Sequence, residues 1–273
     1  MRDTRICCGR SNGRNHARPH LLVLATLLAL GLSCSPASSQ SAIDGDADKL
    51  LHAMASYLGG LKTLSFDYDT DQEIIDRWGQ KLQYSASGAV MASRPDKLHV
   101  TRKGPYADVE ATLNGKLIFL YGRGLNIFAQ MENPGTTIDT GLEEFRISTG
   151  LDAAGADLLS ADPYAVLTET VDEGSFVGTA FVGGVECDHL AFRTEIVDWQ
   201  IWIRKGEQPV PVKYVITSKW VTGAPQYSVR LTNWNVEPKL DESIFTFSPP
   251  AGAKKIEQIG SDVIGDITLE DAQ

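Results

Sequence analysis

Residues 64–71 read Leu64-Ser65-Phe66-Asp67-Tyr68-Asp69-Thr70-Asp71, and this stretch decides the fold. Its apolar side chains alternate with polar ones, which is the period of a β-strand with one buried face and one solvated face. Residues 43–61, just before it, place apolar side chains at spacings of three and four, the period of an amphipathic helix. Asp44 or Asp46 can cap this helix at its start, and Gly59-Gly60 can end it. The chain therefore changes from a helix to a strand just before Leu64.

Beyond this strand, alternating runs separated by turn residues predict two meanders of antiparallel strands, because the connections are too short for parallel crossovers. In the first meander, Asn114-Gly115 lies between two alternating runs, and we expect a primed hairpin turn with positive φ at both residues. Gly183-Gly184 predicts another hairpin turn in the second meander. The strands are expected at 81–92, 97–102, 108–113, 116–121 and 126–131, and then at 176–181, 186–195, 200–204, 212–219 and 226–237.

The segment between the two meanders has a helical pattern. Residues 140–150 predict a weak helix, and residues 156–171 predict two short helices, the second capped by Asp162 ahead of Pro163. Residues 241–245 predict one further helical turn. The fold class is therefore mainly β (α+β), with one strongly curved antiparallel sheet and helices packed on its concave face. Such a sheet encloses a cavity of the kind in which ligands ordinarily bind.

The first forty residues have the layout of a bacterial export signal. Five arginines precede an apolar run from Leu21 to Leu32, which is shorter than the roughly 20 residues that a transmembrane helix needs. Small residues follow, so that signal peptidase could cut after Ser39, or Cys34 could be lipidated and anchor the protein to a membrane. We therefore predict a periplasmic protein with a signal peptide at 1–39, one domain at 40–259 and a loosely ordered acidic tail at 260–273.

The charge of the chain excludes several classes of partner. The net charge is −10, and loss of residues 1–39 would leave 20 Lys plus Arg against 34 Asp plus Glu, a net charge of −14. So negative a protein is not expected to bind nucleic acid, or anionic lipid through a basic patch, and is expected to stay monomeric. Only Cys187 would remain after cleavage at residue 39, so stability must come from a core and not from a disulfide.

Three alternating aspartates have the spacing that begins a calcium-binding loop. Asp67, Asp69 and Asp71 would be its first ligands, but Gln72 and Trp78 stand where that loop needs Gly and Glu. We therefore expect these aspartates on the solvent face of a strand.

No motif in the chain points to catalysis, a metal or a cofactor. Cys187 is predicted to be a small buried residue, with a catalytic thiol paired to His189 as the alternative. The histidines lack metal-ligand spacing, and nucleophile-elbow, zinc-protease and phosphate-loop motifs are missing from the sequence. We therefore predict a protein without enzymatic activity and without cofactors.

Three segments resemble the family of the periplasmic lipoprotein carrier LolA and its outer-membrane acceptor LolB. Residues 87–98 (Ser-Gly-Ala-Val-Met-Ala-Ser-Arg-Pro-Asp-Lys-Leu) resemble the family's strand that ends in Lys-Arg-Pro and resumes as an apolar strand. Residues 114–121 resemble its Asp-Gly-Lys hairpin, and residues 245–252 (Phe-Thr-Phe-Ser-Pro-Pro-Ala-Gly) resemble its C-terminal Phe-Thr-Phe-x-Pro-Pro-x-Gly. The three segments occur in the family's order. The chain is most similar to a branch of this superfamily that has no assigned function.

This resemblance implies an incomplete β-barrel of LolA type, with about eleven strands, a helical lid and a cavity that takes acyl chains. It also implies that Arg94, which matches the Arg of the family's Arg-Pro, holds the lid closed by hydrogen bonds. Otherwise Arg94 would only cap the turn before Pro95. The chain is longer than a typical carrier, and residues 140–171 could rebuild the lid, so we expect Arg94 to contact backbone carbonyls there.

Aromatic side chains are the candidates for a cavity lining. Most aromatic residues of the two meanders are expected in the ordinary core, and a subset is expected to face the ligand. The predicted ligand-binding residues are Phe66, Tyr68, Arg94, Phe119, Tyr121, Phe128, Trp202 and Trp234.

The function predicted from these features is a non-catalytic periplasmic binding or carrier protein for a hydrophobic ligand, such as an acyl chain or a lipoprotein. The alternative is an envelope structural or protein-interaction module, whose barrel is filled by its own side chains and whose partners are other envelope proteins. A hydrolase that acts on an ester or lipid is a third hypothesis, because a cavity is a suitable place for one.

Overall fold

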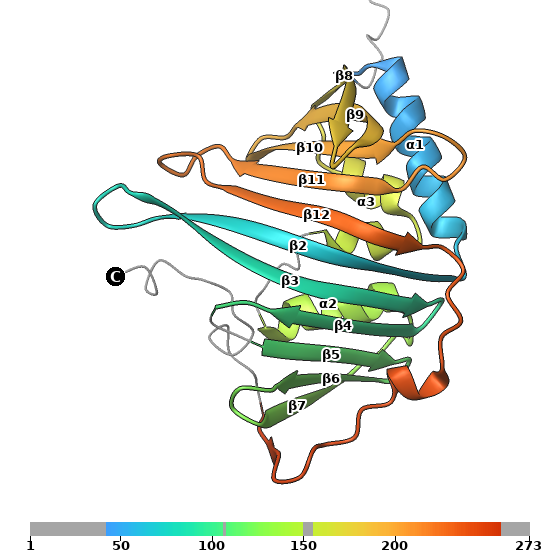
Figure 1. Ribbon diagram of the computed structural model, residues 1–273, viewed down its shortest axis with the longest axis vertical. Helices are drawn as coiled ribbons and strands as arrows, with labels where there is room; N and C mark the ends of the chain where they lie inside the picture. The colour runs from blue at the N-terminus through green and yellow to red at the C-terminus, as the bar shows by residue number, and fades with distance from the viewer. Residues whose placement is uncertain (1–41, 106–107, 150–154, 258–273) are drawn as a thin grey trace, which may run out of the picture. The chain divides into compact units, whose positions relative to one another are not determined.

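The structure is a computed structural model that describes residues 42–105, 108–149 and 155–257 (Figure 1). The predicted signal peptide at 1–39 and the predicted acidic tail at 260–273 lie outside the described residues.

One sheet holds all thirteen strands of the described residues, in the order β1-β8-β9-β10-β11-β12-β2-β3-β4-β5-β6-β7-β13. The eleven strands from β2 to β12 pair with one another antiparallel, and hydrogen bonds between β12 and β2 join the two predicted meanders. The two short edge strands, β1 and β13, pair in parallel with β8 and β7. The strands are β1 (Ala42–Ile43), β2 (Thr63–Ile75), β3 (Lys81–Ser93), β4 (Lys97–Lys103), β5 (Asp108–Asn114), β6 (Leu117–Gly122), β7 (Ile127–Glu132), β8 (Glu173–Val182), β9 (Val185–Arg193), β10 (Val197–Arg204), β11 (Pro211–Ser218), β12 (Gln226–Asn235) and β13 (Lys254–Lys255). The predicted fold class, an open and curved antiparallel sheet with few helices, is confirmed.

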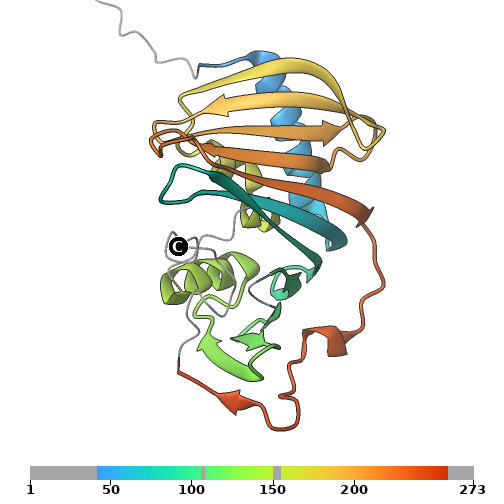
Figure 2. The same ribbon diagram turned by 60° about the vertical axis from the view of Figure 1, so that its left-hand side comes forward.

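Three helices, α1 (Gly45–Gly60), α2 (Ile138–Thr149) and α3 (Pro163–Thr168), cover one face of the sheet (Figures 1 and 2). We call this the inner face and the opposite one the outer face. Alternation decides which side chains reach the inner face, because residues that pair across neighbouring strands point to the same face of the sheet. One such row crosses five strands and is buried along its length; it consists of Leu64, Ala92, Leu98, Leu113 and Ile118.

Helix α1 begins and ends where the sequence predicted. Asp44 is its N-cap, and its Oδ1 accepts a hydrogen bond from the Asp46 backbone N–H at 2.8 Å. The helix ends at Gly60. Its apolar stripe packs against the sheet, and each fully buried Leu contributes roughly 1.5–3 kcal/mol relative to an exposed one. The buried residues of α1 are Ala47, Leu51, Met54, Ala55 and Leu58.

The segment between the meanders also folds as predicted. Helix α2 is followed by the 3₁₀-helix η1 (Ala156–Leu159) and by α3. Asp162 caps α3, since its side chain accepts from the Ala165 backbone N–H at 3.0 Å, and Pro163 takes the first helical position. None of the helices in the described part of the chain has the length and hydrophobicity needed to span a bilayer.

The two predicted hairpin turns differ. At Gly183-Gly184 φ is positive at both residues, 58° and 83°, the pattern of a type I′ turn. At Asn114-Gly115 the prediction is wrong, because φ is positive at Gly115 (88°) and not at Asn114. Asn114 still belongs to β5, and the turn is centred one residue later, on Gly115-Lys116. A glycine at the first central position is the arrangement of a type II′ turn.

Candidate ligand-binding site

Arg94 ties the sheet to the helical segment above it. It lies in the turn between β3 and β4, and its Nη1 donates a hydrogen bond to the backbone carbonyl of Leu159 at 2.7 Å. Leu159 is the last residue of η1. The predicted contact between Arg94 and a backbone carbonyl within 140–171 is therefore confirmed. A role for Arg94 in ligand binding stays a prediction.

The same turn also holds the start of α2. The Ile138 backbone N–H donates to the carbonyl of Pro95 at 2.8 Å. Asp139, on the first turn of α2, accepts from Ser160 Oγ at 2.7 Å and from the Ala161 backbone N–H at 3.0 Å. These bonds link α2 to the residues that follow η1. We call residues 138–149 and 155–168 the lid, and the turn at Arg94-Pro95 its latch.

The guanidinium of Arg94 has hydrogen-bonding capacity left over. Burial lowers the pKa of Arg94, and the nearby Asp139 carboxylate opposes that shift; Arg94 stays charged at neutral pH. Its Nε and Nη2 are buried and have no hydrogen-bond partner among the described residues. A buried donor without a partner is unfavourable by roughly 1–3 kcal/mol. An acceptor atom brought beside these two nitrogens would remove that penalty.

A second polar contact fastens the lid to α1. The Tyr164 hydroxyl on α3 donates to the Asp48 carboxylate on α1, and this bond with burial raises the pKa of Tyr164 to about 12. The His52 ring lies against the Tyr164 ring, with centroids 4.4 Å apart. His52 Nδ1 is also 3.2 Å from Ser56 Oγ. This Ser–His pair lies on the exposed side of α1, and Asp48 bonds to Tyr164 instead of orienting His52, so the pair does not make a Ser-His-Asp triad.

Three of the predicted ligand-binding aromatics do lie on the inner face. The rings of Phe66 and Trp234 are 4.4 Å apart, and Trp234 Nε1 donates to the Pro211 carbonyl at 2.8 Å. Tyr68 reaches across β3 and donates its hydroxyl to the Thr101 carbonyl at 2.9 Å. It can do so because Gly88 lies opposite, where an added Cβ would come within 2.5 Å of the Tyr68 ring. Burial raises the pKa of Tyr68 above its usual value.

Phe119, Tyr121 and Phe128 do not point inward, so their predicted orientation is wrong. They alternate with Ile118 and Leu120, which occupy the inner face. On the outer face all three rings pack around Phe247, with centroids 5.1, 5.8 and 5.4 Å from it. The C-terminal segment that follows η2 (Glu242–Phe245) supplies this cover, and such a distant contact cannot be seen in the alternation of β6 and β7.

Trp202 also lies on the outer face, contrary to its predicted orientation. It alternates with Ile201 and Ile203, which belong to the inner core. Its ring stacks on His189 at 4.1 Å, and Lys213 Nζ lies 4.9 Å from its centroid.

Cys187 is fully buried, as predicted, and burial raises the pKa of its thiol. His189 Nε2 instead lies 2.9 Å from Gln200 Oε1, so the structure does not pair the histidine with the thiol.

The aspartates at 67, 69 and 71 lie on the solvent side of β2, as expected. Asp69 and Asp71 accept from Ser87 Oγ at 2.6 Å and from Ser85 Oγ at 2.5 Å. Asp67 accepts from Asn233 Nδ2 at 2.7 Å. In the described part of the chain no group of three or more His, Cys, Asp or Glu side chains could hold a metal ion.

The lid leaves apolar side chains of the inner face only half-buried. Leu142 and Phe145 of α2 are half-buried, and so are Ala111 and Met131, which pack beside Phe145 around Leu120 and Ala129. Along its whole length α2 buries only Ile138 and Gly141, whereas α1 buries five residues. The surface beneath α2 is therefore the part of the inner face that a hydrophobic ligand could reach with the least rearrangement.

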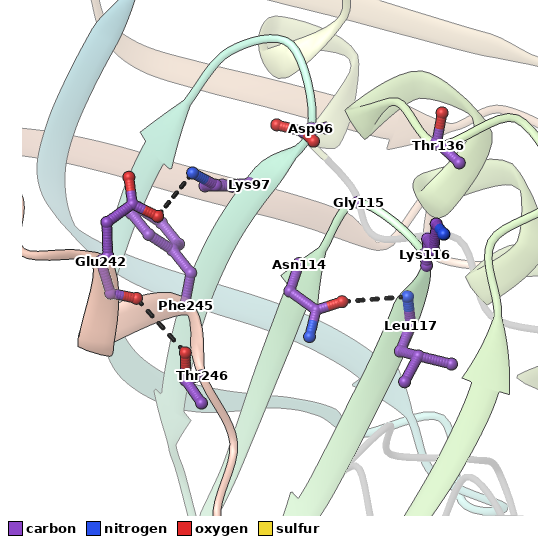
Figure 3. Close-up of a pocket in the computed structure, with 10 residues that line it drawn as sticks. All are labelled: Asp96, Lys97, Asn114, Gly115, Lys116, Leu117, Thr136, Glu242, Phe245 and Thr246. Carbon is purple, nitrogen blue, oxygen red and sulfur yellow. Dashed lines mark hydrogen bonds and ion pairs between the residues drawn. The ribbon is translucent and has the colours of Figure 1, made fainter.

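Two pockets lined by described residues, of different sizes, lie away from this surface. The larger, of about 610 Å³, opens beside the latch between the β3–β4 turn, the β5–β6 turn and η2 (Figure 3). Most of its lining residues are polar or charged: Lys97 Nζ pairs with Glu242 Oε2 at 2.5 Å, and Asn114 Oδ1 accepts from the Leu117 N–H at 3.1 Å. The smaller, of about 220 Å³, includes Trp234 in its wall. The remaining predicted ligand-binding residues line neither pocket.

The open antiparallel sheet with a latched helical lid on its inner face defines a LolA-like protein, so the predicted resemblance is confirmed. The chain belongs to the family described as "Predicted periplasmic protein (DUF2092)", whose model matches residues 47–259. The protein is periplasmic, as its leader sequence predicted.

One relative and two solved structures show how the chain compares with other proteins. An "Outer-membrane lipoprotein carrier protein" of Chromohalobacter salexigens is 33% identical over 94 residues, which cover 34% of this chain and 41% of that protein. The match thus spans less than half the length of this relative. An uncharacterised conserved protein from Thermus thermophilus has a TM-score of 0.48 at 11% identity, covering 78% of this chain and 99% of its own. LprF from Mycobacterium bovis has a TM-score of 0.47 at 11% identity, covering 73% of this chain and 97% of its own.

Proposed function

We propose that this protein is a non-catalytic periplasmic carrier for a ligand with an acyl chain, which enters between the sheet and α2 when the lid opens. The observation that carries the proposal is that α2 lies over half-buried apolar side chains and is joined to the neighbouring segments by hydrogen bonds at its first turn. The carrier protein of Chromohalobacter salexigens, which matches this chain over part of its length, supports the same class of ligand.

The energies involved make such opening feasible. The charge-assisted bond from Arg94 to the Leu159 carbonyl contributes roughly 1.5–3 kcal/mol when it is shielded from water. Each methylene that leaves water contributes about 0.8 kcal/mol. Burial of a handful of methylenes would therefore offset the loss of the latch. The two free donors of Arg94 could then bind an ester or amide oxygen next to the chain.

Titration with a fluorescent fatty acid tests the proposal. Arg94→Leu should leave the fold intact and change the affinity or the release rate of the probe by about tenfold or more, since loss of the latch shifts a two-state lid by that factor. Amide hydrogen exchange in α2 should speed up in the same variant. Arg193→Leu is the control, because Arg193 is an exposed arginine of β9 whose partner Glu173 lies on the neighbouring strand.

If neither wild type nor Arg94→Leu binds any acyl probe, the carrier proposal fails and the envelope-interaction alternative takes its place. One observation favours that alternative: beneath α1 the inner face is filled by the protein's own buried side chains, such as Leu190, Trp199 and Ile201. If a probe binds wild type and Arg94→Leu with the same affinity and rate, the protein is still a carrier but Arg94 has no part in binding or release.

A further inference from the structure

The exposed large apolar side chains gather at one end of the sheet. Antiparallel pairing brings the β2–β3, β6–β7, β9–β10 and β11–β12 turns to this end, on the left in Figure 1. Nine large apolar residues of the described chain are exposed, and more than half of them lie in these four turns, which we call the tryptophan end. They are Trp78, Leu125, Ile196, Trp220 and Val221.

The turns at the opposite end have a different composition. They read Arg94-Pro95-Asp96, Asn114-Gly115-Lys116, Gly183-Gly184 and, at 205–209, Lys-Gly-Glu-Gln-Pro. Phe181, close to the Gly183-Gly184 turn, is the exposed apolar side chain nearest to this end. The difference shows that the apolar tips are a property of one end of the sheet and not of turns in general.

The apolar tips are held in place by hydrogen bonds. Trp220 Nε1 donates to the Glu195 carbonyl at 2.8 Å, and Lys219 Nζ donates to the Thr194 carbonyl at 2.7 Å, so the β11–β12 and β9–β10 turns form one unit. In the β2–β3 turn, Asp76 Oδ1 accepts from the backbone N–H of Trp78 at 2.9 Å. Trp78 and Trp220 are 72% and 77% exposed on these braced turns. The hydrogen bonds within these turns therefore hold both indole rings in exposed positions.

We propose that the tryptophan end docks on the surface of a lipid bilayer, with the indole rings in the headgroup layer. Each tryptophan has a cation beside it: Arg77 Cζ lies 4.1 Å from the Trp78 ring centroid, and Lys219 Nζ lies 5.8 Å from that of Trp220. Tryptophan next to Lys or Arg is the composition that anchors proteins at a membrane interface. The periplasm is bounded by membranes, so such a surface is within reach.

Two features favour a bilayer over a protein partner. The apolar tips are separate projections with polar residues such as Thr222 and Gln80 between them, whereas a protein interface needs a continuous, shape-matched patch. The nearby charges are balanced: Asp198 lies 3.7 Å from Lys219 Nζ, and Lys81 pairs with Glu73 at 2.9 Å. We therefore expect docking that depends on the indoles and only weakly on salt.

Binding to vesicles of phosphatidylethanolamine and phosphatidylglycerol tests this inference. The protein is purified from the periplasm in a Cys34→Ala background, so that no lipid anchor contributes. Wild type in this background should sediment with the vesicles, and Trp78→Ser/Trp220→Ser should lower the partition coefficient by at least about tenfold, since indole rings dominate interfacial anchoring. Phe181→Ser is the matched control, an equally exposed aromatic away from the tryptophan end, and should bind like wild type.

Brominated lipids add a second readout, because bromine quenches the fluorescence of a tryptophan inserted among the lipids. Quenching should be large in the wild type and small in the double variant. No vesicle binding by the wild type, or equal loss in Phe181→Ser and the double variant, overturns the inference and leaves a protein partner as the occupant of this end. The result is independent of the fatty-acid titration, since vesicle docking needs no open lid.

Discussion

Two of the helices that cover the inner face of the sheet, α1 and α2, are held in contrasting ways. Beneath α1, five helix residues are fully buried against the sheet, and the helix is part of the core. Beneath α2, Leu142 and Phe145 stay half-buried, and polar contacts at Pro95 and Asp139 hold the helix. A helix held by its apolar face unfolds with the core, whereas a helix held by a few polar contacts can lift without unfolding the sheet. We therefore expect α1 to contribute most to stability and α2 to be the helix that moves.

Matched Leu→Ala substitutions test this contrast most strongly. Leu51→Ala in α1 should lower the free energy of unfolding by about 2–5 kcal/mol, because a fully buried leucine leaves a cavity. Leu142→Ala in α2 should cost about 1 kcal/mol or less, since a half-buried side chain loses little contact. Denaturant unfolding measures both values. Equal losses in the two variants would show that α2 belongs to the core, and the lid would have to be placed elsewhere.

The sequence predicted the order and type of the elements well, because period and capping are local. The α1 cap at Asp44, the α3 cap at Asp162 and the alternating strands all follow from residues within one turn of one another. The faces were harder to predict. Alternation showed that Phe119 and Ile118 point to opposite sides, but Phe247, far along the chain, decides that the aromatic side is the outer one.

The candidate site was predicted only in part for the same reason. The resemblance led to Arg94 and to a carbonyl within the right segment, but nothing local to either residue marks Leu159 as the acceptor. Trp220 is one of the aromatic residues of the second meander, most of which were expected in the core, and the structure shows it 77% exposed. The nearby Thr222, Gly223 and Pro225 are typical of a turn, and that composition was the available signal. Tertiary contacts, which no window of sequence contains, decide each of these cases.

Hydrogen bonds through Asn133 link the β5–β6 turn to the first turn of α2. The Gly115 carbonyl accepts from Asn133 Nδ2 at 2.8 Å, and Asn133 in turn accepts from Thr140 Oγ1 at 2.7 Å on the first turn of α2. Gly115→Val should lower the free energy of unfolding by roughly 1–2 kcal/mol, because a β-branched residue resists the positive φ of 88°. It should also speed hydrogen exchange at the start of α2.

Gly124→Val, in the β6–β7 turn, is the control for Gly115→Val. An added Cβ at Gly124 meets no atom within 4 Å, and its φ is not in the left-handed region, so its effect should stay within about 0.5 kcal/mol. A Gly115→Val protein as stable as the Gly124→Val protein would mean that the β5–β6 turn adapts without strain and gives α2 no support.

The smallest expected effect is a pH dependence on the outer face of the same region. His99, on β4, is half-buried, and burial lowers its pKa below the usual value; Glu110, 3.7 Å away, opposes the shift, and Arg123 adds to it. Thr112 Oγ1 lies 3.4 Å from His99 Nδ1, and a hydrogen bond between the ring and the backbone of Ile244 in η2 also opposes the lowering of the pKa. A histidine whose pKa is lower in the folded protein binds fewer protons there than in the unfolded chain. Stability should therefore fall as the pH drops below about 6.5, the usual histidine value, and recover above it.

The outer face carries His99 in the first meander and His189 in the second, so variants of each can separate the two contributions to the pH dependence. Burial also lowers the pKa of His189 on β9, so this histidine contributes with the same sign. Carboxylates with lowered pKa values, such as Glu73, titrate in the unfolded chain only near pH 4.5, so they leave the window from pH 5 to 6.5 to the histidines. The slope of unfolding free energy against pH in that window should flatten in His99→Gln and in His189→Gln. The change in each variant gives the contribution of the histidine that it replaces. Only His99→Gln should also change the hydrogen exchange of η2, because the His99 ring bonds to its backbone at Ile244. A slope that neither variant flattens would show that both rings keep their ordinary pKa and that the cover over β4 is insensitive to pH.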